Sequence, residues 1–303
     1  MLAFHLYGTC HQRVAMYLST PVQPDQQPEL WDDHVTVYEA VFEPLTSAFA
    51  RRALDRLRLM PANRLLDVAA GSGGAALLAA RFGVDVLAVD ASPRMVSRIL
   101  ERAAEARIGE RLRAKVMDGT ALALPDASVD SAISTFGVVL FPDAAAGMRE
   151  IARVLKPGGR VAVVTWTEPE QYEIATRLIG AIAAVRGPQL PPPTIPAQLR
   201  FREESAFRAL FGTANLNVEE IVRAEECLQA PSARWLARHV EFAPGMAAWL
   251  SSLGNDREPI LEAFVSALER DQGVGEISLS AVAFIGIGTR AGSACSRIKA
   301  SRD

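Results

Sequence analysis

The sequence has little of the material on which several classes of protein depend. Its three cysteines, Cys10, Cys227 and Cys295, are too few and too far apart for a disulfide framework or for a zinc site built from cysteine pairs. No apolar run approaches the roughly 18 residues of a membrane-spanning helix. The net charge of −3 gives no broad basic field. We therefore expect no metal site, no membrane span and no nucleic-acid partner.

What the sequence does have is the composition of a folded enzyme-sized domain. Half of its 303 residues are hydrophobic and 22% are charged, which excludes an intrinsically disordered chain. The length fits one sizeable domain, or one domain with a cap. The first 19 residues lack a basic segment followed by a long apolar one, so we expect no secretory signal and a cytoplasmic protein. Met16 offers a second candidate start.

From residue 64 onward, short apolar runs alternate with helical patterns. This alternation predicts parallel βαβ units with helices on both faces of a sheet. We expect an α/β fold with a doubly wound, seven-stranded, mostly parallel sheet and a helical cap. The predicted strands are residues 64–68, 84–89, 113–117, 129–135, 161–166, 218–223 and 277–287.

The remaining segments predict how the chain is divided. Residues 1–30 end in a polar, proline-rich stretch and are expected to be a flexible extension, whereas residues 31–60 have the pattern of cap helices. The core is expected over residues 61–230. Residues 231–272 are helical in pattern and form a second part of the cap, inserted before a final strand and tail at 273–303.

The strongest chemical motif is the run LLDVAAGSGGAA at residues 65–76. Asp67 ends a strand, and a glycine turn then opens a helix, so a ligand can approach the backbone and meet free N–H groups. The run also satisfies the pattern G-x-G-x-x-A of dinucleotide-binding proteins. Asp90 follows Gly73 by 17 residues and suits the ribose hydroxyls of either kind of cofactor. These residues therefore predict an adenosine site without naming the cofactor.

Three further features separate the alternatives. Asp67 precedes Gly71 by four residues, where a pyrophosphate binder avoids a negative charge. The third strand is followed by Asp118-Gly119, where an acid can accept a hydrogen bond from an adenine amino group. The fourth strand ends in STFGVVLFPD at residues 134–143, and LKPGG precedes the fifth.

On these motifs the sequence resembles the class I S-adenosylmethionine (SAM)-dependent methyltransferases. Within that class it is similar to the branch of the ubiquinone/menaquinone-biosynthesis C-methyltransferases and many small-molecule methyltransferases. The resemblance is tight over residues 63–166 and looser over 31–62 and 200–288. It implies a Rossmann-like version of the predicted sheet, SAM as cofactor, and methyl transfer by in-line displacement to a small organic acceptor.

The resemblance also implies a role for each matched residue. By looser analogy, Tyr38 and Thr46 close over the cofactor. The residues implied to bind SAM are Asp67, Ala69, Gly71 and Gly73 at the methionine end, Asp90 at the ribose, Ala91, Met95, Asp118 and Gly119 around the adenine, and Thr135 and Phe136 at the mouth.

The sequence departs from the family at two places. The family more often has glycine at the position of Ala69 and often has cysteine or threonine at that of Ala70. The histidine that often follows the fourth strand in related enzymes is replaced here by Leu140 and Phe141. No motif therefore assigns a catalytic residue. A sulfonium needs chiefly an aligned nucleophile and exclusion of water, but a phenol or enol also needs a base. Candidate bases are His34, His239, Glu241 and Tyr172.

Two other functions stay open. One is a SAM-binding protein that transfers no methyl group, and the less favoured one is an NAD(P)-dependent oxidoreductase, which leaves Asp67 unexplained. Apolar cap residues suit a hydrophobic or aromatic acceptor, unless they only bury the cap on the core. Those residues are Trp235, Phe242, Met246, Trp249, Leu250 and Phe264. The sequence specifies neither the methylated atom nor the oligomeric state.

Overall fold

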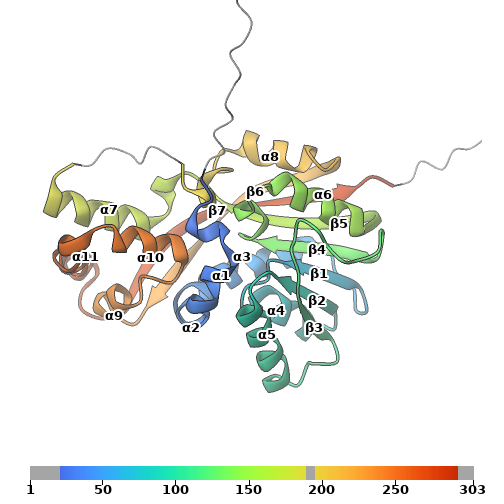
Figure 1. Cartoon of the computed structure of the whole chain (residues 1–303), viewed down its shortest axis with the longest axis horizontal. Coiled ribbons are helices and arrows are strands. Elements are labelled where there is room, and N and C mark those ends of the chain that lie inside the picture. The colour runs from blue at the N-terminus through green and yellow to red at the C-terminus, as the bar shows by residue number, and fades with distance from the viewer. Residues whose placement is uncertain (1–20, 189–194, 293–303) are drawn as a thin grey trace, which may run out of the picture.

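A central sheet of seven strands organises the computed structural model, which describes residues 21–188 and 195–292 (Figure 1). The order is β3-β2-β1-β4-β5-β7-β6, and β7 alone runs opposite to the other six strands. The expected fold class is therefore confirmed. The strands are β1 Arg64–Val68, β2 Asp85–Asp90, β3 Leu112–Val116, β4 Val129–Thr135, β5 Leu155–Trp166, β6 Leu216–Ala230 and β7 Ile277–Arg290.

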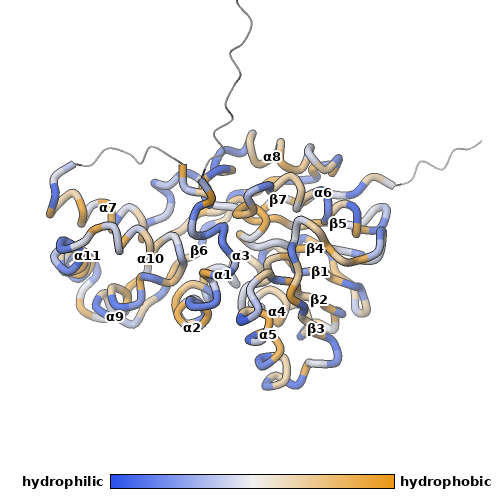
Figure 2. The backbone as a smooth tube through the Cα atoms, viewed as in Figure 1, coloured by the Kyte–Doolittle hydropathy of each residue, from blue (hydrophilic) through white to orange (hydrophobic). Residues whose placement is uncertain are grey.

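Helices cover both faces of this sheet. Because successive strand residues point to opposite faces, Leu65 joins one apolar cluster and Leu66 the other. The first cluster packs against α3 (Glu43–Arg56), α4 (Gly74–Arg81) and α5 (Pro93–Glu105). The second packs against α6 (Ala144–Val154) and α8 (Glu204–Gly212). Figure 2 shows the apolar residues concentrated in the central strands between these layers.

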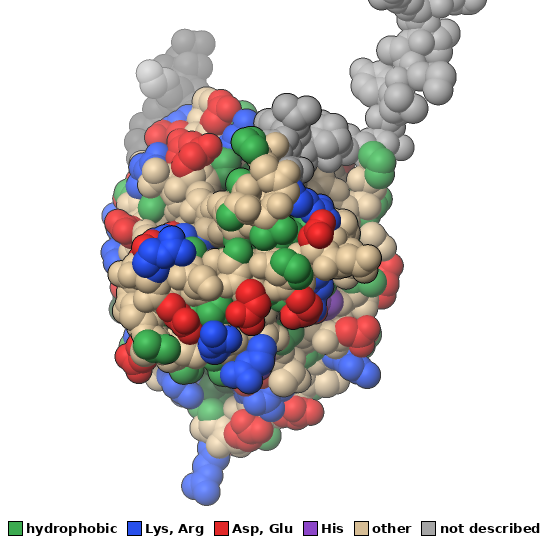
Figure 3. Space-filling view, turned by 90° about the vertical axis from the view of Figure 1, so that its left-hand side faces the viewer, with side chains coloured by type: hydrophobic (Ala, Val, Ile, Leu, Met, Phe, Trp, Pro, Cys, Tyr) green, Lys and Arg blue, Asp and Glu red, His purple; other side chains and the backbone are tan. Residues whose placement is uncertain are grey.

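The cap lies at the end of the sheet formed by β6 and β7. Its helices α9 (Ala233–Arg238), α10 (Pro244–Ser251) and α11 (Arg257–Gln272) connect these two strands, and α11 packs against α7 (Glu173–Arg186). Figure 3, which looks onto this end of the molecule, shows acidic and basic side chains interspersed over the surface. None of the helices at residues 21–188 and 195–292 has the length and apolar character needed to cross a bilayer.

Three strands are longer than the sequence predicts by three residues or more. Strand β6 has 15 residues and β7 has 14, because both extend beyond the apolar runs to carry the cap. The charged residues of β6 interrupt its apolar run, because an edge strand can keep one face in water. The full length of the strand therefore cannot be predicted from hydropathy. Strand β5 begins at Leu155 rather than at residue 161, and takes in the LKPGG turn with an irregular register opposite Val129.

The N-terminal segment differs most. Residues 1–20 of the expected extension lie outside the described residues, but Pro24–Gln26 and Pro28–Trp31 are helical turns. The helical pattern then continues through α2 (Val35–Val37) and a π-helical turn at Tyr38–Phe42 into α3. π-helical turns occur frequently at functional sites, and this one places Tyr38 beside the glycine turn.

Candidate functional site

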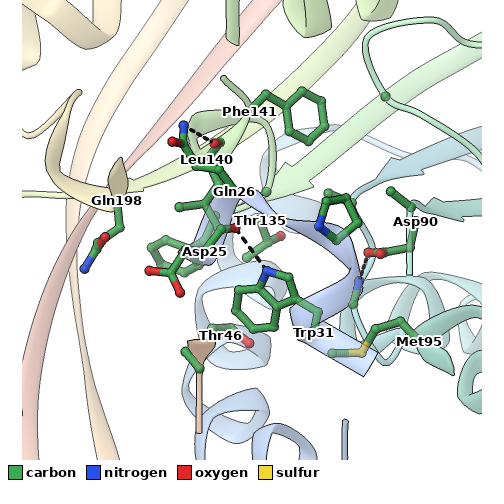
Figure 4. A pocket seen from close by; sticks show the side chains of 18 of the residues that line it. Asp25, Gln26, Trp31, Thr46, Asp90, Met95, Thr135, Leu140, Phe141 and Gln198 are labelled. Carbon is green, nitrogen blue, oxygen red and sulfur yellow. Dashed lines mark hydrogen bonds between the residues drawn. The ribbon is translucent and has the colours of Figure 1, made fainter. Parts of the chain in front are cut away.

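A cavity of about 740 Å³ opens at the carboxyl ends of β1, β2 and β4 (Figure 4). The strand order reverses between β1 and β4, which is where ligands bind in open α/β sheets. Loops after the strands form one wall, while the N-terminal segment and the cap form the others. Nine of the eleven residues assigned from the sequence line the cavity: Ala69, Gly71, Asp90, Ala91, Met95, Asp118, Gly119, Thr135 and Phe136.

The glycine turn after β1 has a backbone that only glycine adopts without strain. Gly71 has φ +56° and Gly73 has φ +94°, where Gly73 forms the N-cap of α4. A Cβ on Gly73 would lie 2.9 Å from Cγ1 of Ile99, so this position also permits close packing of α5. Gly73 lies behind the turn rather than among the cavity-lining residues.

Two residues other than glycine also take left-handed backbone conformations at the cavity. Ala69 has φ +54° and Phe136 has φ +60°, and both line the cavity. The positive φ of Ala69 explains why the methyltransferases that this sequence resembles more often have glycine at that position. Such strained residues cluster at ligand-binding sites, where the surrounding structure holds them in place.

Asp90 connects β2 to the glycine turn. Its Oδ2 accepts the Gly71 N–H at 2.8 Å and its Oδ1 accepts the Ser92 N–H at 2.9 Å. An ionised carboxylate has about four lone-pair sites, so each oxygen keeps acceptor capacity toward the cavity. Burial raises the pKa of Asp90 to about 6.

Asp67 lies in a smaller cavity that adjoins the main one and is also lined by Tyr38 and Thr46. Only 1% of Asp67 is exposed, and its Oδ2 has no hydrogen-bond partner in the described structure; the Oγ1 of Thr135 is likewise unpaired. Burial, helped by the negative charge of Asp90, raises the pKa of Asp67 to about 7. A buried carboxylate without a partner is costly, and a cationic ligand group would relieve that cost.

Asp118 and Gly119 form the wall after β3. The Oδ1 of Asp118 accepts the N–H of Thr120 at 2.7 Å and its hydroxyl at 2.8 Å, which leaves Oδ2 for a ligand. A Cβ on Gly119 would lie 2.5 Å from the ring of Phe141. Met95, on α5, is buried and also lines the cavity.

Aromatic rings build the other half of the cavity. Trp166 stacks on Phe136 with ring centres 4.0 Å apart and on Tyr172 at 4.8 Å. Phe42 stacks on Phe242 of the cap at 4.5 Å. Of the six cap residues expected near an acceptor, Phe242 and Met246 line the cavity, whereas the following four do not: Trp235, Trp249, Leu250 and Phe264.

The N-terminal segment supplies cavity residues that sequence reasoning missed. Asp25, Gln26 and Trp31 line the cavity, and the Trp31 indole N–H donates to the Asp25 carbonyl at 3.0 Å. The amide of Gln26 donates to the Leu140 carbonyl at 2.9 Å, which ties the segment to the loop after β4. The segment is polar and proline-rich, and its partners are distant in sequence, so no local pattern indicated it.

The four candidate bases are not brought together. His34 and His239 each hydrogen-bond a carbonyl four residues earlier, at 2.7 Å, and neither lines the cavity. Glu241 pairs with Arg257 at 2.9 Å. Tyr172 does line the cavity, but burial and the charge of Asp25 raise its pKa well above the ordinary value. A phenol that resists ionisation is a poor base.

Comparison with known proteins shows what part of this core is similar to. Residues 66–163 match the family model described as a methyltransferase domain. This part of the chain is therefore similar to a methyltransferase domain, as the sequence motifs predicted. Members of this family use SAM as their cofactor, as the resemblance had implied.

Curated proteins are similar to about half of this chain. An uncharacterized protein of Mycobacterium tuberculosis (strain H37Rv) is 35% identical over 159 residues, which cover 50% of this chain and 56% of the relative. The demethylmenaquinone methyltransferase of Renibacterium salmoninarum is 30% identical over 155 residues, which cover 48% of this chain and 61% of that protein. The chain thus spans little more than half the length of these relatives.

The fold is shared with solved structures. The [4+2]-cyclase SpnF superposes with a TM-score of 0.52 at 19% sequence identity. The match covers 81% of this chain and 81% of the SpnF chain. Identity this low carries information about the fold alone.

Proposed function

We propose that the protein transfers a methyl group from SAM to a small hydrophobic or aromatic acceptor. One observation carries this proposal: a single cavity joins a carboxylate-lined end, with Asp90 and Asp118, to an end walled by the rings of Trp166, Tyr172 and Phe242. The first end has the chemistry that adenosine requires, and the second has the chemistry of an apolar acceptor.

The residues present fit SAM. Its amino acid end carries an ammonium group, which the unpaired Oδ2 of Asp67 suits. The free lone pairs of Asp90 suit the ribose hydroxyls, and the Oδ2 of Asp118 suits the adenine amino group, with Met95 as an apolar wall. When bound, SAM supplies a methyl group on a positively charged sulfur, which is already electrophilic.

The protein then has to align the acceptor and keep water out. The stacked rings of Phe136, Trp166 and Tyr172 form an apolar wall against which a planar acceptor can pack. Placing the nucleophile in line with the reacting carbon accounts for much of the rate, because the cost in orientational entropy is met on binding. The N-terminal segment covers this wall through the contact between Gln26 and the Leu140 carbonyl.

Titration calorimetry with SAM and S-adenosylhomocysteine (SAH) tests the proposal. We expect micromolar binding of both ligands by the wild-type protein. Replacing the ribose acceptor, Asp90→Ala, should weaken binding by about 1–3 kcal/mol, as for a lost hydrogen bond to a charged group. Asp33→Ala is the matched control, because the Asp33 side chain is 83% exposed. Binding of NADH in place of SAM, or of neither ligand by folded protein, would reject the proposal.

The second candidate is a SAM-binding protein that transfers no methyl group. The observation in its favour is that none of the four candidate bases suits a cavity reaction: three lie outside the lining, and Tyr172 resists ionisation. Turnover of a panel of quinols, phenols and amines, followed by SAH release, separates the two functions. Release of SAH with any acceptor of the panel selects the enzyme.

A further inference from the structure

The charged side chains that line the described cavity are all acidic: Asp25, Asp90, Asp118 and Asp143. The side chain of Asp143 is 62% exposed, and it accepts the Ala146 N–H at 2.8 Å as the N-cap of α6. Asp90 and Asp118 belong to the adenosine end. Asp25 is therefore the acid of the aromatic end, and no lysine, arginine or histidine of the described residues lines the cavity with it.

This charge distribution restricts the acceptor. A carboxylate, a phosphate or an ionised phenol would enter the cavity with no cationic side chain to pair with and would face the charge of Asp25. Burying a charge without a partner is strongly unfavourable. An uncharged acceptor avoids that cost, but a neutral hydroxyl is a weak nucleophile and has to lose its proton inside the cavity.

Asp25 has the geometry to take that proton. Its Oδ1 accepts the N–H of Gly245, at the start of α10, at 2.6 Å. Its Oδ2 has no hydrogen-bond partner in the described part of the chain, and a side chain on Gly245 would collide with it. In Figure 4, Asp25 lies on one side of Trp31 while Asp90 and Met95 lie on the other.

The groups that face Asp25 come from three elements. Burial raises its pKa, whereas the Gly245 N–H and the charge of His34 oppose that rise. Tyr172 lies close enough that the charge of Asp25 raises the pKa of the phenol. A base is most effective when its pKa lies near the working pH, so an aspartate shifted upward suits this task better than an exposed one.

We propose that Asp25 is the general base of the reaction and that the acceptor is an uncharged planar molecule bearing a hydroxyl group. This inference rests on the proposed function and names its substrate class. The acceptor oxygen forms a bond to the methyl carbon while the sulfur–carbon bond breaks, with its electron pair passing to sulfur. The hydroxyl proton passes to Oδ2 of Asp25. The products are a methyl ether, SAH and a protonated Asp25, which returns its proton to solvent.

Binding of two ligands with the same ring system tests the inference without turnover. The protein is saturated with SAH and titrated with 2-naphthol and with 2-naphthoate, which differ in carrying a hydroxyl or a carboxylate. We expect the wild-type protein to bind 2-naphthol at least tenfold more tightly. Asp25→Asn keeps an oxygen for the Gly245 N–H but removes the charge, so the preference should shrink about tenfold, mostly through tighter binding of 2-naphthoate.

Gln26→Ala is the matched control. It loosens the same segment by removing the hydrogen bond to the Leu140 carbonyl, and it leaves the charge of the cavity unchanged. The binding of 2-naphthol and that of 2-naphthoate should weaken by the same factor in this variant. An Asp25→Asn protein that behaves in the same way would show that Asp25 only anchors the segment.

The inference is overturned if the wild-type protein binds 2-naphthoate as tightly as 2-naphthol, or if neither binds at millimolar concentration. In both cases SAH binding shows which proposal has failed. Intact SAH binding means that the role of Asp25 alone is wrong, whereas its absence removes the proposed function.

Discussion

At the scale of single residues, the buried acids of the cavity were partly predictable from the sequence. Asp67 is the last residue but one of β1 and Asp90 is the last residue of β2, so chain order alone brings them to the same edge of the sheet. Asp25 gave no such indication. Its carboxylate is held by the N–H of Gly245, which lies 220 positions away in the sequence. Sequence motifs indicate residues that lie close together along the chain or at the ends of successive strands. They do not indicate contacts between residues far apart in the sequence, such as Asp25 and Gly245.

The ionisation of Asp67 should make the stability of the ligand-free protein depend on pH. Its pKa of about 7 lies above the ordinary value near 3.9, so between these values the unfolded state binds fewer protons than the folded state. Stability is therefore highest below about pH 4 as far as this group is concerned, and falls as pH rises through 7. Asp90, with a pKa of about 6, adds to the same slope.

Replacing Asp67 by asparagine should flatten that slope. We expect Asp67→Asn to gain about 1–3 kcal/mol relative to wild type between pH 5 and pH 8, measured from urea unfolding midpoints without ligand. Asp130→Asn is the opposing control, because its hydrogen bonds to Lys156 and to the Arg64 N–H lower the pKa of Asp130. Removing that carboxylate should cost stability at pH 8. Equal slopes for wild type and Asp67→Asn would contradict this account.

At the scale of elements, the alternation of strands and helices was predictable because each apolar run has a clear period and each turn has glycine or proline. The lengths of β6 and β7 were not. Glu225 and Glu226 lie on the outer half of β6, and their charge interrupts the apolar pattern although the strand continues to Ala230. The antiparallel pairing of β6 with β7 runs from Leu216 to Ala230, and it keeps the second half of β6 extended.

The packing between neighbouring loops leads to a prediction at this scale. A Cβ at position 119 would lie 2.5 Å from Cε2 and Cζ of Phe141, so Gly119→Ala has to displace the loop after β4. We expect a loss of about 1–3 kcal/mol in unfolding free energy from overpacking, together with weaker SAH binding. Chemical denaturation and calorimetry measure the two effects.

The control for this substitution is Gly109→Ala. A Cβ there would meet nothing within 4 Å, so stability and SAH binding should stay close to wild type. If the Gly119 and Gly109 variants behave alike, the loops after β3 and β4 are not in the close contact that the structure shows.

At the scale of the whole molecule, one cavity is assembled from three parts of the chain. The core contributes Asp90, Asp118 and the glycine turn, and the cap contributes Phe242 and Met246. The N-terminal segment contributes Asp25 and covers both. The sequence indicated the first part by motif and suggested the second by composition. The sequence predicted that residues 21–30 belong to a flexible extension, because a polar stretch with several prolines has no apolar period. The structure instead uses those polar groups as hydrogen-bond donors and acceptors, for example Gln23 with the Ile195 carbonyl and the Ala197 N–H.

This assembly predicts that the two halves of the cavity respond to different ligands. SAH should slow backbone hydrogen exchange in the glycine turn and at residues 90–95 and 117–120, whose side chains and backbone line the carboxylate end. Adding 2-naphthol to the SAH complex should then protect residues 24–31 and 242–246. Ligand binding lowers the population of locally open states in the segments that it contacts, so protection reports the contact directly.

Helix α8 is the internal reference for this exchange experiment, because none of its residues lines the cavity and its rate should not change. Protection of residues 24–31 by SAH alone would mean that the N-terminal segment covers the cofactor rather than the acceptor. Asp25 would then lie beside the cofactor, and its proposed role as general base would be rejected. Separate responses of the two halves would instead support a division of the cavity in which Trp31 stands between the cofactor end and the carboxylate that receives the acceptor's proton.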